Sequence, residues 1–366
     1  MRTAPMVAFL VALFAPLGAQ AAGPAPCQAH VILFVPAGVK PPVGYQQRVD
    51  EIVNYTEAFF QRELQRWGHE NTVAPFRRSA DGHIEVMMLP GKKKTAEYKP
   101  VTLRAETMDA LRAQKKLDGG RQIWWIMVYA GDPPARFDGF LGGFGPEIGG
   151  WSVCNFDTTA GRIDPAAPMG SDFLAKLMLK GMIHELGHAF QLPHIGPRLR
   201  DGEGNTLMGP THANFRRVVP AGADRVYLSE AAAAMLSTHP AFRGAPDDRG
   251  ALPKVDVQDL KCVVDRSRKG IFVSGRVWTS QPVAYALVAD ESDARPGEYW
   301  TKTYVGKVAA DGSFEVLVSE PAPAAGTLRT WFAFENGAQT GNGKTRGRES
   351  GIAKKYTFTR QQWVFE

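Results

Sequence analysis

The hydrophobic positions in the first half of the chain change between short continuous runs and helical spacing. Residues 29–35 are almost wholly apolar and precede Pro36, which is typical of a strand buried on both faces. Apolar residues then recur at three- and four-residue intervals from Tyr45 to Trp67, which predicts a long amphipathic helix. Similar patterns predict strands at 83–89 and 122–129 and a weaker helix at 105–117. This order predicts a mixed sheet flanked by helices.

Residues 140–156 are rich in glycine, and the spacing of these glycines does not match the glycine-rich turn of a dinucleotide-binding sheet. We therefore expect a glycine-rich edge strand followed by a stronger strand at 150–156. Ser171 can cap a helix that runs to about Gln191, because apolar side chains recur on one helical face throughout this stretch. A second serine-capped helix is predicted at 228–236, where alanine is abundant.

The pattern changes after residue 242. Residues 243–253 combine glycine, proline and charge without periodicity, which predicts a linker. Short strand-like runs separated by turn residues follow, for example at 271–278, 283–288, 314–318 and 330–334. No helical pattern lies between these runs, so residues 254–366 are predicted to form an all-β sandwich. The predicted fold class is α+β, with a first domain at 22–242 whose own apolar elements should let it fold alone.

The N-terminus has the features of a secretory signal peptide. Arg2 precedes an apolar run at 6–15, and the small-residue site Ala19-Gln20-Ala21 follows. We expect residues 1–21 to be removed and the protein to be exported, to the periplasm or the extracellular space. No other apolar run approaches the ~20 residues of a transmembrane helix, so no membrane span is expected.

Composition indicates a globular protein and says little more about its class. The 366 residues are 44% hydrophobic and 22% charged, as in ordinary globular proteins. The formal net charge of +6 is spread without a long basic run, so nucleic acid is not an expected partner. Three cysteines leave at least one thiol unpaired within a single chain. Free buried thiols are favoured over a bridge between Cys27 and Cys154.

The chemistry of the chain is concentrated in the segment HELGHAFQLPH. His184 and His188 are four residues apart on the predicted helix, so both imidazoles lie on one face and can hold one cation. Glu185 is one residue round the helix, where its carboxylate can act as a general base for a water molecule at the metal. His194 follows Pro193, which can turn the chain back toward the metal. Three imidazoles with one open position suit a catalytic Zn²⁺.

This segment, together with the sequence NTLMGP at 205–210, resembles the metzincin clan of zinc metallopeptidases, although no subfamily can be assigned. The resemblance implies a mixed twisted sheet with backing and active-site helices. It implies that His184, His188 and His194 are zinc ligands, that Glu185 is the catalytic base and that Met208 is the methionine of the Met-turn. It also implies Tyr227 as a candidate transition-state stabiliser. The clan has glycine where this chain has Gln191, and that glycine lets the backbone leave the helix, often with positive φ. Either Gln191 adopts this conformation at some steric cost, or Leu192 and Pro193 provide another exit.

We therefore interpret the chain as a secreted zinc-dependent metalloendopeptidase that hydrolyses peptide bonds with a zinc-activated water. Its expected partners are protein or peptide substrates, with a glycan or protein ligand as a further candidate for the C-terminal domain. Two alternatives stay open: a non-catalytic binding protein on a metallopeptidase scaffold, and a zinc enzyme whose third ligand is Glu230 or Glu203. A structural Ca²⁺ site is a weaker prediction, from the alternation of Asp201, Glu203 and Asn205.

Overall fold

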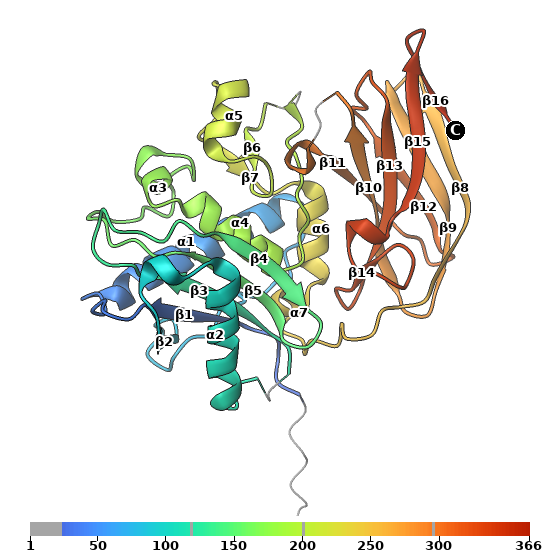
Figure 1. Cartoon of the computed structure of the whole chain (residues 1–366). Helices are drawn as coiled ribbons and strands as arrows, with labels where there is room; N and C mark the ends of the chain where they lie inside the picture. Colours follow the sequence, from blue (N-terminus) through green and yellow to red (C-terminus); the bar gives the residue numbers. More distant parts are fainter. Residues whose placement is uncertain (1–23, 118–119, 200–201, 295–296) are drawn as a thin grey trace, which may run out of the picture.

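The computed structural model describes residues 24–117, 120–199, 202–294 and 297–366 (Figure 1). The predicted signal peptide at 1–21 therefore lies outside the described residues. Among the helices that are described, none combines the length and the apolar character needed to cross a membrane.

The first half of the chain forms a five-stranded sheet in the order β2-β1-β3-β5-β4. Four strands are parallel, and β4 runs antiparallel to β5 at one edge. The strands are β1 (Ala29–Val35), β2 (Val86–Pro90), β3 (Gln122–Val128), β4 (Leu141–Gly145) and β5 (Gly149–Asn155). The predicted glycine-rich edge strand and its stronger neighbour are thus confirmed.

Helices cover both faces of this sheet (Figure 1). Alternate residues of β1 and β3 pack into two different cores: Leu33 and Trp125 join α1 (Tyr45–Arg66) and α4 (Leu179–Ala189), whereas Phe34 and Trp124 join α2 (Pro100–Ala113). Burial on both faces explains why β1 and β3 are continuously apolar.

The helix predicted from Ser171 to Gln191 is interrupted, and this prediction is corrected here. Met178 has φ 56°, so the chain forms α3 (Asp172–Lys176) and then α4, with a left-handed residue between them. The periodicity of apolar side chains continues across the break because both helices bury their apolar faces in the same core. The break falls at a methionine, whereas the nearest glycine, Gly181, lies within α4.

The polypeptide between α4 and the C-terminal region forms short elements. Two-residue strands β6 (Asn205–Thr206) and β7 (Val226–Tyr227) pair in parallel, with α5 (His212–Val218) between them. The predicted alanine-rich helix is α6 (Glu230–Thr238), and the Ser229 hydroxyl accepts the N–H of Ala232 at its start, as predicted. The short helix α7 (Pro240–Arg243) follows.

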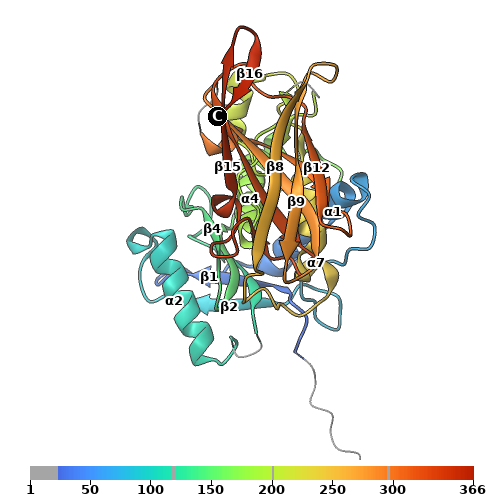
Figure 2. The same ribbon diagram turned by 90° about the vertical axis from the view of Figure 1, so that its right-hand side faces the viewer.

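The C-terminal region consists of two antiparallel sheets, which Figure 2 shows with β8 and β9 facing the viewer. The six-stranded sheet has the order β11-β10-β13-β15-β16, with β14 paired to β13, and the three-stranded sheet has the order β12-β9-β8. The two sheets share one hydrophobic core. The strands are β8 (Val255–Asp265), β9 (Gly270–Thr279), β10 (Val283–Ser292), β11 (Lys302–Lys307), β12 (Ser313–Val318), β13 (Gly326–Phe334), β14 (Gln339–Thr340), β15 (Ile352–Thr359) and β16 (Gln362–Phe365).

Helix α6 lies between the first sheet and the C-terminal sheets (Figure 1). Its alanine side chains allow close approach, and Leu236 shares one hydrophobic core with Leu287 of β10 and Trp331 of β13. Leu287 and Trp331 are both fully buried. The apolar core is therefore continuous from the first sheet into the C-terminal region.

The segment 243–253, predicted as a linker, is packed against the first half of the chain. The side chains of Asp247 and Arg249 are fully buried and form an ion pair at 2.6 Å. Arg249 also donates to the side-chain oxygen of Gln191 at 3.1 Å, and Arg121 donates to the main-chain oxygen of Asp247 at 2.9 Å. These contacts fix the path of the chain between its two halves.

Candidate metal centre and active site

Helix α4 carries the first two histidines, and it packs unusually close to the edge of the first sheet. A Cβ atom on Gly142 of β4 would lie 2.2 Å from the main-chain oxygen of Glu185, and one on Gly150 of β5 would lie 2.0 Å from that of Ala189. Only glycine fits at both places. The glycine-rich edge is thus what lets the helix bearing His184 and His188 rest directly on the sheet.

The chain leaves α4 through Gln191, which has φ 65°. This left-handed conformation costs a non-glycine residue about 1 kcal/mol. Polar contacts hold it in place: the side-chain oxygen of Gln191 accepts from Arg249, and its main-chain oxygen accepts from Gln339 at 3.2 Å. After this turn His194 comes back to the face of α4 that carries His184 and His188.

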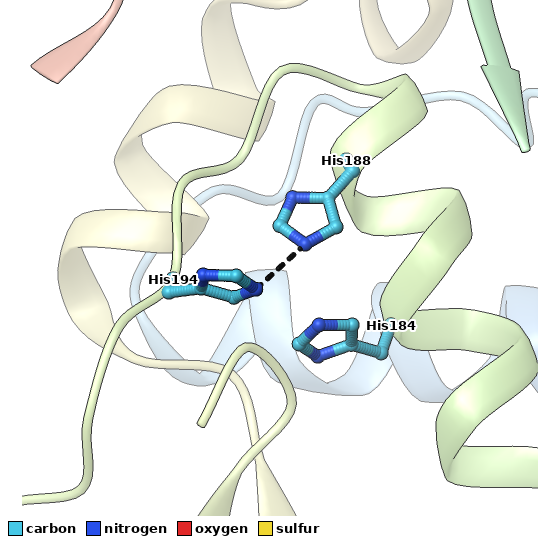
Figure 3. A group of neighbouring side chains, drawn as sticks. All are labelled: His184, His188 and His194. Carbon is cyan, nitrogen blue, oxygen red and sulfur yellow. Dashed lines mark hydrogen bonds between the residues drawn. The ribbon is translucent and has the colours of Figure 1, made fainter. Parts of the chain in front are cut away.

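The three histidines converge, as Figure 3 shows, with two rings coming from α4 and the third from the loop that follows it. One ring nitrogen from each residue lies within 4.8 Å of those of the other two, and the Nε2 atoms of His188 and His194 are 3.0 Å apart. Among the residues that the structure describes, this is the one group of three or more His, Cys, Asp or Glu side chains arranged to hold a metal ion.

The imidazoles of His184 and His188 are each oriented by a contact between Nδ1 and a main-chain oxygen. Nδ1 of His184 lies 2.9 Å from the main-chain oxygen of Leu207, and Nδ1 of His188 lies 2.8 Å from that of Leu192. Both Nδ1 atoms can therefore donate a hydrogen bond, which leaves Nε2 as the unprotonated nitrogen.

Burial keeps the three imidazoles neutral. It lowers the pKa of His184 well below its ordinary value and the pKa of His188 to about 4. Burial also lowers the pKa of His194, opposed by the nearby carboxylate of Glu298. Neutral imidazoles are the form that binds metal ions, so the site is prepared for a cation at neutral pH.

Glu185 lies beside the triad in a half-enclosed position. Burial raises the pKa of its carboxyl group to about 7, and the backbone N–H of Gly142 opposes this shift. A carboxylate with a pKa near neutrality is suited to accepting and returning a proton. Glu185 and His184 line a cavity of about 440 Å³ whose walls are largely apolar, with Phe140, Met178 and Tyr299 among the lining residues.

Met208 lies directly beneath α4. A Cβ atom on Gly187 would be 2.5 Å from the Met208 sulfur, so the helix and the methionine are in close contact. The turn that carries Met208 is tied to α4 by the buried Lys180, whose ammonium group donates to the main-chain oxygens of Gly209 and Pro210. Burial lowers the pKa of Lys180 to about 7. The turn therefore packs beneath the histidine-bearing helix and holds it in place.

The other candidate residues contact groups outside the three-histidine cluster. The hydroxyl of Tyr227 accepts the N–H of Arg198 at 3.3 Å. Glu230 lies 3.8 Å from the guanidinium of Arg198, and Glu203 pairs with Arg66. The side-chain amide of Asn205 donates to the main-chain oxygen of Pro210, and Asp201 lies outside the described residues.

The structure adds site residues that the sequence reasoning missed, and they come from the C-terminal region. Glu298 and Tyr299 belong to a single 3-10 turn, η3 (Glu298–Trp300), just before β11. The carboxylate of Glu298 lies 3.0 Å from Nδ1 of His194, and the ring of Tyr299 lies 3.9 Å from the ring of His194. They are more than 100 residues from the histidines in the chain, and their local sequence carries no motif, so no pattern could have indicated them.

The cysteines are unpaired, as favoured from the sequence. Cys27 and Cys154 are free and buried, and Cys262 is free and partly exposed. Burial raises the pKa of the Cys27 thiol to about 12. Thiols that stay protonated and buried are chemically inert, so they act as core residues.

Comparisons with known proteins identify solved structures with a similar fold. No family model matches the chain, and no curated protein matches it. Solved structures of OgpA from Akkermansia muciniphila are similar along nearly the whole length. Wild-type OgpA has a TM-score of 0.69 at 18% identity, covering 98% of this chain and 100% of OgpA. A catalytically inactive OgpA in complex with an O-glycopeptide substrate, glycodrosocin, has a TM-score of 0.68 at 18% identity, covering 93% and 96%. The shared fold includes both the mixed α+β part and the sheet-rich C-terminal part.

Proposed function

We propose that this protein is a zinc-dependent peptidase of metzincin type that hydrolyses peptide bonds in proteins or glycopeptides. The observation that carries the proposal is the convergence of His184, His188 and His194 beside the half-buried carboxylate of Glu185. The likeness of the fold to OgpA supports the same class of activity.

The donor set fits zinc. Two nitrogens that share a tetrahedral Zn²⁺ at 2.0–2.1 Å are roughly 3.3 Å apart, and the Nε2 atoms of His188 and His194 are separated by 3.0 Å. Three neutral nitrogens without a cysteine are typical of catalytic rather than structural zinc sites. Zinc bound there would polarise the scissile carbonyl and lower the pKa of water.

Glu185 supplies the proton chemistry. Its carboxylate takes one proton from the attacking water while the water oxygen forms a bond to the peptide carbonyl carbon. Glu185 then returns that proton to the amide nitrogen as the C–N bond breaks. The products are a free amine and a carboxylic acid, which ionises at neutral pH.

The metzincin assignment is supported by two local features. Met208 lies under the histidine-bearing helix, and Gln191 has the positive φ that the clan's glycine usually provides. The chain meets this backbone requirement with a larger residue that side chains on two other segments hold in place.

The substrate class and the location of the protein are parts of the same proposal. OgpA was crystallised with an O-glycopeptide, and we propose that peptides carrying O-linked glycans are the preferred substrates here. The signal peptide predicted at 1–21 would place the enzyme outside the cytoplasm.

Incubation of the purified protein with a peptide library and a matched O-glycopeptide library, analysed by mass spectrometry, tests the proposal. We expect cleavage that a chelator abolishes and added Zn²⁺ restores. Absence of cleavage by fully zinc-loaded protein in both libraries would favour the alternative of a non-catalytic binding protein.

A further inference from the structure

The C-terminal region reaches into the metal centre through the turn η3. The N–H of Gly196, two residues after His194, donates to the main-chain oxygen of Thr301 at 2.7 Å. A Cβ atom on Gly196 would lie 2.4 Å from the main-chain carbon of Trp300. The loop that carries His194 and the turn that carries Glu298 are thus in direct backbone contact, with no room for an intervening side chain.

Nδ1 of His194 contacts the Glu298 side chain, whereas Nδ1 of His184 and of His188 each contact a main-chain oxygen. The Glu298 carboxylate lies 3.0 Å from Nδ1 of His194. Arg348 contacts both residues, since its guanidinium lies 3.8 Å from the Glu298 carboxylate and donates to the main-chain oxygen of His194 at 3.2 Å. A carboxylate at Nδ1 fixes the orientation of the ring and increases the basicity of Nε2.

Tyr299 lies over the triad. Its ring centroid is 3.9 Å from that of His194 and 6.0 Å from that of His184, in a tilted and a stacked arrangement respectively. The residue is 40% exposed and lines the same cavity as Glu185 and His184.

We propose that this turn of the C-terminal region completes the catalytic centre: Glu298 is a positioning residue for His194, and the Tyr299 hydroxyl donates a hydrogen bond to the peptide oxygen that becomes negatively charged. This inference rests on the proposed function and adds to it two residues outside the HELGHAFQLPH segment. It assigns the oxyanion-stabilising phenol to Tyr299 rather than to Tyr227, whose hydroxyl is bonded to Arg198.

The role of Glu298 is tested by zinc affinity, which does not depend on activity. Glu298→Ala should raise the zinc dissociation constant about 10- to 100-fold, as is typical when the hydrogen-bond partner of a metal ligand is removed. Glu298→Gln keeps an acceptor oxygen for Nδ1 and should recover part of the loss. The control is Glu315→Ala, an exposed glutamate on β12 of the same region. Parental affinity in folded Glu298→Ala would overturn this part of the inference.

The role of Tyr299 is tested by separating kcat from KM. Tyr299→Phe should lower kcat about 100-fold, the effect of removing one oxyanion donor, with KM and zinc affinity unchanged. Tyr285→Phe on β10 is the matched control and should keep the parental kcat. A Tyr299→Phe variant with parental kcat, or with a raised KM alone, would overturn the assignment while leaving the proposed function intact. A wild-type protein without hydrolytic activity would instead remove the proposed function and the role of Tyr299 together.

Discussion

Nε2 of His188 lies 3.0 Å from Nε2 of His194, although the two residues belong to different local structures. His188 is fixed by the geometry of α4, whereas His194 depends on the left-handed turn at Gln191. The third imidazole is therefore the part of the site that most depends on tertiary contacts. It is also the part that separates a three-histidine site from one with a glutamate ligand.

His194→Ala is predicted to weaken zinc binding on the order of 100-fold, because it removes one of three nitrogen donors. Glu230→Ala and Glu203→Ala should keep the parental affinity, since these side chains pair with Arg198 and Arg66 instead. Zinc titration of the three variants at neutral pH, after circular dichroism confirms folding, measures the difference. Loss of affinity in a glutamate variant alone would favour the glutamate-ligated alternative.

A chain ending at Pro253 is predicted to be insoluble or to unfold at a much lower temperature. The sequence led us to expect that the first half folds alone, but Leu287 and Trp331 cover α6, and their removal would expose the core around Leu236. Soluble yield and thermal unfolding, compared with the full chain, measure this effect. A truncated chain that is soluble and unfolds at the temperature of the full chain would show that the shared core is dispensable.

Gly142→Ala is predicted to destabilise the protein by about 1–3 kcal/mol, the usual range for overpacking. The new methyl group would collide with the main-chain oxygen of Glu185, 2.2 Å away, and push α4 from the sheet. Gly143→Ala on the opposite face of β4 is the control, because its nearest neighbour is the side chain of Trp151 at 3.1 Å. Urea unfolding should place the Gly143 variant near the wild type, and equal losses in both variants would contradict the packing argument.

His239 is predicted to make the protein less stable in mild acid. Its side chain is buried, Nδ1 accepts the N–H of Ala241, and burial lowers its pKa well below the ordinary value. The unfolded chain gains a proton below about pH 6.5 whereas the folded chain does not, so the free energy of unfolding falls by up to ~1.4 kcal/mol per pH unit. That contribution is fully present above pH 6.5 and is lost as the pH falls.

His239→Asn keeps an acceptor for Ala241 and removes the titrating group, so the pH dependence of unfolding between pH 5 and 7 should become shallower. The exposed His83 provides the control. Its contact with Asp50 raises its pKa, so its contribution to the free energy of unfolding changes with pH in the opposite direction. Urea unfolding of metal-free protein across this range measures both. An unchanged slope in the His239 variant would contradict the linkage.

Local sequence patterns predicted most of the first sheet and the core of the site. Continuous apolar runs, helical spacing and the histidine motif each depend on neighbours in the chain, so β1, α1 and the pair His184 and His188 could be found from sequence. The break at Met178 could not, because its left-handed conformation is imposed by packing rather than by a glycine. Glu298 could not be found either, because its role exists only where two distant segments meet.

The most direct test of the central claim compares Glu185→Gln with the wild type. The amide is nearly isosteric with the carboxylate but cannot accept the proton of the attacking water. We predict parental zinc stoichiometry and thermal stability with hydrolysis of peptides or O-glycopeptides reduced at least ~100-fold. Hydrolysis at the parental rate by Glu185→Gln would contradict the account, because the half-buried carboxylate beside the three histidines would then have no part in the reaction.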